Sequence, residues 1–142
     1  MTFLTAVTIG FLILEMSNVV TLYFFPGFQY ANGVGVFNAW EKSKQDPEIH
    51  DFVKYLVNWV AGTKLIFIML LIVILYAGND QVLQLTGVAL ILSILSFFWR
   101  LFPLVRRMDA AGQITPPRYS VALGGMIFAF IAIFVVAVLT TL

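Results

Sequence analysis

The chain contains no cysteine and only one histidine among its 142 residues. The lack of cysteine excludes a disulfide, a thiolate metal ligand and a thiol nucleophile. A single histidine excludes a histidine-rich metal cluster and, within one chain, bis-histidine haem ligation, so no metal site is expected. Charge is scarce as well, since charged residues make up 11% of the chain and the net charge is +1. The charge therefore gives no basis for binding nucleic acid.

Apolar residues dominate what remains. Hydrophobic residues account for 61% of the chain, and the mean hydropathy is +0.99. Soluble globular domains average about 45–50% apolar and about 25% charged residues. The composition therefore predicts an integral membrane protein that crosses the bilayer several times. We expect it to be an all-α four-helix bundle, because a helix satisfies its own backbone hydrogen bonds in lipid.

Each of the four apolar segments is about as long as the roughly 20 helical residues that cross a bilayer. The first has no basic flank of the signal-peptide type, so we expect it to be retained as a span. Asp46 as N-cap and Pro47 at the first helical position predict that the second helix begins in the cytoplasm at about residue 47. Pro103 is expected to end the third helix. The prediction is a single domain over residues 1–142 with spans at about 3–25, 56–78, 82–102 and 119–140.

The basic residues are distributed on one side of this predicted topology. All of them fall in the first and third connections or in the helix segments that lead into them, while the second connection and both termini have none. The positive-inside rule then places those two connections in the cytoplasm and both termini outside. The residues are Lys42, Lys44, Lys54, Lys64, Arg100, Arg106, Arg107 and Arg118.

Three polar residues interrupt the first two apolar spans. Glu15 lies near the middle of the first span with Asn18 one turn further on, and Lys64 lies inside the second. A charge at the centre of a bilayer costs about 2.5–3.5 kcal/mol on insertion scales. One interpretation is a buried ion pair, or a proton-accepting carboxylate on a transport path. The other is a protonated Glu15 hydrogen-bonded inside the bundle, with Lys64 extending to the cytoplasmic headgroups.

A second polar set lies at the cytoplasmic side of the predicted bundle. Lys54 and Asn58 are one turn apart on the second helix, and Arg118 opens the fourth. Arg100 ends a thin seam on the third helix, in which Thr86, Ser93 and Arg100 recur every seven residues. Such groups can bind an anion whose apolar tail enters the bilayer. They can equally serve only as topology determinants and contacts to lipid headgroups.

Part of the sequence resembles the MAPEG family, the membrane-associated proteins of eicosanoid and glutathione metabolism. Asp46-Pro47, followed by Lys54 and then Asn58, resembles that family's segment from the first loop into the second helix, and Arg118-Tyr119-Ser120 resembles the start of its fourth helix. The resemblance implies a homotrimer that holds an amphipathic anion between protomers at the cytoplasmic side. That anion would be either a lipid carboxylate or glutathione, which is then a possible cofactor.

The chain also differs from the family at positions that bear on catalysis. Lys54 stands where the family has arginine, and Ala61 where it has a carboxylate. A lysine ammonium does not reproduce the bidentate hydrogen bonds of an arginine guanidinium. We therefore assign no catalytic residue and leave open whether the protein is an enzyme.

Three hypotheses on function follow from the sequence. The first is a MAPEG-like protein that binds an amphipathic anion through Lys54, Asn58, Arg100 and Arg118. The second is a small oligomeric transporter or channel whose path is lined by Glu15 and Lys64 and supported by Asn18. The third is a non-catalytic subunit of a larger membrane complex, docked through the small residues of the fourth helix. The hypotheses differ in where polar side chains should converge: at the cytoplasmic side, in mid-membrane, or nowhere.

Overall fold

Helices account for nearly all of the regular structure in the computed structural model, which describes residues 2–141. Among these residues no strand is present beyond one isolated bridge, between Phe37 and Ile114. Four helical segments are long and apolar enough to cross a membrane, namely α1, α3, α4 together with α5, and α6. The predicted all-α, multi-pass membrane class is thus confirmed. The elements are α1 (Phe3–Phe24), η1 (Val34–Val36), α2 (Asn38–Ser43), α3 (Pro47–Ala77), α4 (Asp80–Leu95), α5 (Phe97–Ala110) and α6 (Tyr119–Leu139).

Polar side chains cap the starts of three of these helices. The Thr2 hydroxyl accepts a hydrogen bond from the amide of Thr5 before α1, and the Asn79 side chain accepts one from the amide of Val82 at the start of α4. Before α3, the Asp46 carboxylate accepts hydrogen bonds from two first-turn amides. With its 31 residues, α3 is about 46 Å long at 1.5 Å per residue. This exceeds the roughly 30 Å of bilayer hydrocarbon, so part of α3 must project from it.

The third span differs from the expectation at Pro103. This residue lies inside α5, and the helix continues past it to Ala110. A proline within a helix removes one backbone hydrogen bond, which can kink the helix instead of ending it. The interruption in this span falls at Ser96, between α4 and α5, so the third crossing consists of two helical segments.

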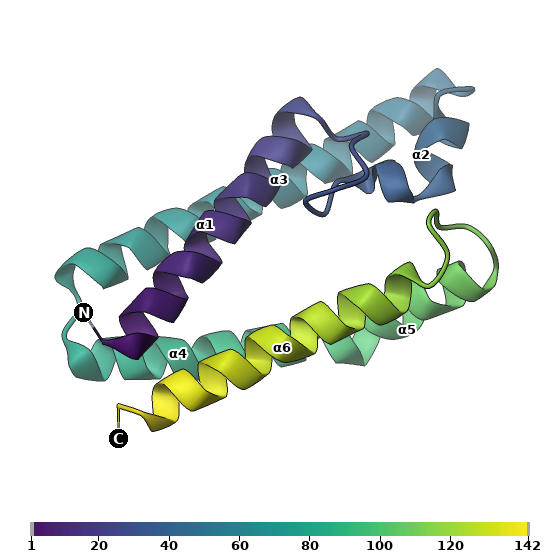
Figure 1. Cartoon of the computed structure of the whole chain (residues 1–142). Coiled ribbons are helices and arrows are strands. Elements are labelled where there is room, and N and C mark those ends of the chain that lie inside the picture. The colour runs from purple at the N-terminus through teal and green to yellow at the C-terminus, as the bar shows by residue number, and fades with distance from the viewer. Residues whose placement is uncertain (1, 142) are drawn as a thin grey trace.

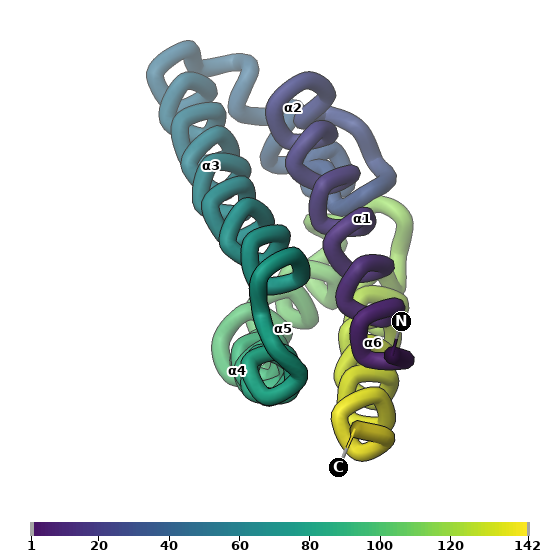
Figure 2. Tube along the Cα trace, turned by 90° about the vertical axis from the view of Figure 1, so that its left-hand side faces the viewer, coloured from purple at the N-terminus to yellow at the C-terminus, as the bar shows by residue number. Residues whose placement is uncertain are grey.

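The helices form two layers, each built from an antiparallel pair. In one layer α1 packs along α3, and in the other α6 packs along α4 and α5 (Figure 1). Both ends of the chain and the turn between α3 and α4 lie at the same end of the molecule (Figure 1). The connections that contain the basic residues lie at the opposite end, as the tube view also shows (Figure 2). We call these the terminal end and the loop end.

The largest hydrophobic cluster joins the two layers at the terminal end. Phe134 is fully buried there, and the Phe11 ring contacts it edge-on at a centroid distance of 5.4 Å. At Gly87 of α4, an added Cβ would lie only 2.7 Å from a Val138 methyl carbon, so a small residue permits α4 and α6 to approach closely. The buried residues of this cluster are Leu4, Leu71, Leu83, Leu90, Phe134, Ala137 and Val138.

A second junction, which we call the loop clasp, ties the layers together at the loop end. It consists of residues 36–38 from the first connection and 112–115 from the third. The Asn38 amide donates to the Gln113 carbonyl (3.0 Å), and the Thr115 amide donates to the Val36 carbonyl (2.9 Å). The Thr115 hydroxyl donates to the side-chain oxygen of Asn38 at 3.1 Å. Behind these bonds lies a hydrophobic cluster of the buried residues Val36, Val105 and Ile114.

The topology can be tested with single cysteines because the parent chain has none. Asn79 and Gln45 are both exposed, and they lie at opposite ends of α3. In intact cells, a membrane-impermeant thiol reagent should label Asn79→Cys, since the basic connections are expected in the cytoplasm. Gln45→Cys should react only after permeabilisation. The reverse labelling pattern would show that the termini and the α3–α4 turn face the cytoplasm.

Candidate functional site: a pocket between the helix layers

A cavity of about 480 Å³ lies between the two helix layers. Its volume falls within the range of about 300–1,000 Å³ that small-molecule sites occupy. Its walls come from α1, the turn at residues 31–32, α4, α5 and α6, whereas α3 contributes none of them. The lining residues are Phe11, Leu14, Glu15, Ser17, Asn18, Ala31, Asn32, Ser93, Ile94, Ser96, Phe97, Arg100, Leu101, Met126, Ile127 and Phe130.

The pocket combines apolar walls with a few polar groups. Phe11 and Phe130 contact each other on its wall with ring centroids 5.8 Å apart, and Phe97 adds a third aromatic ring. On α1 the lining residues Phe11, Glu15 and Asn18 follow helical spacing, which places them on one face of the helix. Apolar walls with a small number of polar groups are typical of sites for small or amphipathic molecules.

Glu15 is paired with Lys64 at one wall of the pocket. The Lys64 Nζ atom lies 2.5 Å from the Glu15 Oε2 atom, and the two side chains are 29% and 20% exposed, respectively. The pair links α1 to α3 within the first layer. Of the two residues, only Glu15 lines the pocket. The structure therefore brings together the two charged mid-membrane residues that the sequence singled out.

Asn18 holds the turn that covers the pocket at the loop end of α1. Its side chain is buried, and its amide nitrogen donates to the Ala31 carbonyl at 2.7 Å. Ala31 and Asn32 both have left-handed backbone conformations, with φ of 51° and 56°. At Gly33 an added Cβ would lie 2.2 Å from the Phe28 carbonyl oxygen, so only glycine fits there. Asn18 is thus a positioning residue for residues 31–32 of the pocket wall.

Arg100 supplies the positive charge at the rim of the pocket. It is exposed, and its guanidinium carbon lies 5.5 Å from the centroid of the Trp99 ring. Within residues 2–141, Arg100 forms no salt bridge with a carboxylate. Because Lys64 pairs with Glu15, these three groups together have a net formal charge of +1. The electrostatics of the pocket therefore favour an anionic group near Arg100.

The four residues expected to bind an anion do not all line the pocket. Lys54 is exposed and paired with Asp51 at 2.8 Å, and Asn58 is exposed on α3. Arg118 is exposed at the start of α6, where its backbone amide donates to the Asp109 carboxylate. Arg100 alone of the four lines the pocket. In the described part of the chain, no hydrogen bond joins any two of the four side chains.

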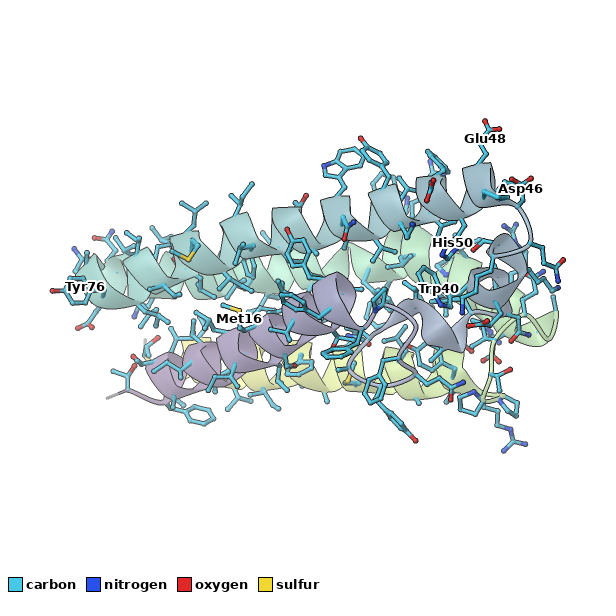
Figure 3. The ribbon with its side chains drawn as sticks, turned by 90° about the horizontal axis from the view of Figure 1, so that it is seen from above. Met16, Trp40, Asp46, Glu48, His50 and Tyr76 are labelled. Carbon is cyan, nitrogen blue, oxygen red and sulfur yellow. The ribbon has the colours of Figure 1, made fainter. Side chains whose placement is uncertain are left out.

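His50, the only histidine, has a packing role next to Lys54. Its ring lies 4.9 Å from the Trp40 ring, and its Nδ1 atom is 2.8 Å from the Ser43 hydroxyl oxygen. Figure 3 shows Trp40 and His50 near each other at the end of α3 that is remote from Tyr76. These contacts fasten the short helix α2 to α3. Residues 2–141 contain no group of three or more histidine, aspartate or glutamate side chains that could hold a metal ion.

Sequence reasoning found part of the pocket and missed the rest. The seven-residue seam identified Ser93 and Arg100, which both line it, but also Thr86, which does not. It missed Ser96, which lies at the helix interruption, and Asn32, which lies in a turn where no periodicity operates. The aromatic wall could not be distinguished in the sequence from the many other aromatic residues of the spans.

Comparison with known proteins adds no relative to this description. The chain matches no family model, no curated protein and no solved structure.

The Glu15–Lys64 pair predicts coupling between the two positions. Glu15→Gln should destabilise the protein more than the double variant Glu15→Gln/Lys64→Met does, because the single change leaves a partly buried ammonium without its partner. We expect an interaction energy of at least about 1 kcal/mol from a double-mutant cycle of unfolding in detergent. The matched control is the exposed pair of Asp51 and Lys54, changed as Asp51→Asn and Lys54→Met. Its interaction energy should be less than about 0.5 kcal/mol. An additive cycle at Glu15 and Lys64 would favour the protonated form of Glu15.

Proposed function

We propose that this multi-pass membrane protein binds an amphipathic anion in the pocket between its helix layers. The anionic head would lie at Arg100, with the polar groups of Asn32 and Ser96 within the same cavity. The apolar part would pack against Phe11, Phe97 and Phe130. The proposal keeps the ligand class that the resemblance to the MAPEG family implies. It places the ligand within one chain instead of between protomers at the cytoplasmic side, where Lys54 and Asn58 on the cytoplasmic face of α3 would contribute. If copies assemble into the homotrimer that the resemblance implies, each copy would have its own pocket.

The observation that carries the proposal is the charge at Arg100. The only other ionisable side chain on the pocket wall is Glu15, which is already paired with Lys64. A hydrogen bond to a charged group contributes about 1.5–3 kcal/mol, and partial exclusion of water strengthens the electrostatic part. A bound anion would therefore give Arg100 the charged partner that residues 2–141 do not provide.

The walls favour a lipid carboxylate over glutathione. Three aromatic rings and several aliphatic side chains line the cavity, and these can pack against a hydrocarbon tail. Glutathione has several charged groups and no such tail, so its burial there would leave charges without partners. A fatty acid has one anionic head and an apolar body, which matches one guanidinium and an apolar cavity.

Transport through the membrane is the second candidate function. It is favoured by the contact between Glu15 and Lys64, because a charged pair inside two spans is costly and is commonly found on ion or proton paths. In this case Glu15→Gln would abolish a flux of ions or protons in liposomes, whereas loss of Arg100 would have a smaller effect.

Ligand binding distinguishes the proposed site from the cytoplasmic face of α3. Oleate should bind the purified protein in lipid nanodiscs, and Arg100→Gln should weaken this binding at least tenfold, or about 1.4 kcal/mol. Titration calorimetry or displacement of a fluorescent fatty acid gives the affinity, with glutathione titrated separately.

The controls are Arg106→Gln on the same helix and Lys54→Gln on α3, both of which lie outside the pocket and should stay within twofold of the parent. A tenfold loss in Lys54→Gln with an unchanged Arg100→Gln would instead place the ligand at the cytoplasmic face of α3. Absence of binding, together with a flux that depends on Glu15, would leave the transporter as the function.

A further inference from the structure

Packed apolar side chains separate the pocket from the loop clasp along α5 and α6. On α5, Val105 follows the lining residue Leu101 by one turn, and on α6, Leu123 precedes Ile127 by one turn. Both belong to the cluster behind the loop clasp, whose members Val36, Val105 and Ile114 are at most 3% exposed. The hydrogen bonds of the clasp cross directly from one loop to the other. These side chains fill the space beside α5 and α6 between the pocket and the clasp, while Ala31 and Asn32, which line the pocket from the loop end of α1, are exposed.

The terminal end is closed in the same way. On α6, Phe134 follows the lining residue Phe130 by one turn and is fully buried, and on α4, Leu90 precedes Ile94 by one turn and is 5% exposed. Phe134 and Leu90 belong to the large cluster that joins the layers. The pocket is thus an interruption between two packed regions and not part of a continuous pore.

The side of the pocket is open. Leu14, Leu101 and Met126 line it and are also 51%, 52% and 41% exposed. All three belong to helices that are apolar and long enough to cross a membrane, so their exposed surfaces face lipid chains. Exposed apolar side chains at the rim indicate an opening toward hydrocarbon, where their exposure carries no hydrophobic cost.

We infer that the pocket exchanges its ligand directly with the bilayer through this lateral opening, and that the ligand is a single-chain lipid anion. This inference rests on the proposed function and adds the ligand's source and route. The cavity has the size of a small-molecule site, and the remainder of a long tail can pass between the rim residues into the surrounding lipid. The anionic head can be a fatty-acid carboxylate or the phosphate of a lysophospholipid, since Arg100 can pair with either.

A reversible lock at the loop clasp tests the route. Asn38→Cys/Thr115→Cys introduces the only two cysteines of the chain at side chains whose oxygen atoms are 3.1 Å apart. The protein is reconstituted in lipid vesicles, a photoreactive fatty acid is added, and light flashes at increasing delays fix the ligand. Mass spectrometry then gives the rate at which adducts form on residues 93–101 and 126–130. The oxidised and reduced forms should load at rates within twofold of each other.

Narrowing the lateral opening should slow loading. Met126→Trp places a larger side chain at the rim and should slow the appearance of adducts at least tenfold. Phe128→Trp is the matched control, because Phe128 lies on the same helix, is 66% exposed and does not line the pocket. The final adduct yield separates slow loading from misfolding, which lowers that yield. If Met126→Trp lowers it, Leu101→Trp provides the same test on α5.

The outcomes separate the route from the binding itself. Loading that is tenfold slower in the oxidised double-cysteine variant, and restored by reductant, would overturn the inference and place access at the loop end. Loading at the parental rate in both Met126→Trp and Leu101→Trp would also overturn the lateral route. Pocket adducts that never form in the parent would overturn the proposed function together with the inference. A photoreactive lysophosphatidic acid, used in parallel, identifies which anionic head is loaded.

Discussion

The cost of placing a charge in lipid governs how the interior of this protein is arranged. Glu15 meets Lys64 across the first layer, so neither charge lies alone in the span. That contact also joins α1 to α3. Of the two ionisable side chains on the pocket wall, this leaves Arg100 without a salt bridge in the described part of the chain. The same pairing that permits two charges in the membrane thus sets the sign of the charge that the pocket can accept.

The two layers are held together mainly at their ends. Large apolar side chains join them near the termini, and backbone and side-chain hydrogen bonds join them at the loop clasp. Between these junctions the layers enclose a cavity. The polar side chains of α1 that line it form hydrogen bonds to α1 itself, to α3 or to the turn at residues 31–32, and not to the other layer. Asn18 bonds to Ala31, and Glu15 bonds to Lys64, so neither reaches across to the other layer. The pocket lies between the apolar junction at the terminal end and the hydrogen-bonded junction at the loop end.

The sequence predicted the helices well because local physics determines them. Hydropathy marked the spans, and Asp46 with Pro47 marked the start of α3. The sequence-based prediction was wrong at Pro103, because whether a proline ends a helix or only kinks it depends on the packing around it. The anion set was predicted from helical spacing, from depth and from the resemblance, and none of these shows how the faces of different helices are turned toward one another. Arg100 lines the pocket, while Lys54 and Asn58 are exposed on α3, a helix that forms none of its walls.

The turn over the pocket has a conformation that its own residues do not favour. Alanine seldom adopts a left-handed backbone, which costs about 1–2 kcal/mol for a residue with a Cβ. Ala31 nevertheless has φ of 51°, and its carbonyl receives the amide of Asn18 from the adjoining helix. The conformation of this segment is therefore supported by a helical residue 13 positions earlier as well as by Gly33 of the turn itself. It follows that a chain differing only at position 18 could present a different roof to the same cavity, so this helix position would influence ligand choice without touching the guanidinium.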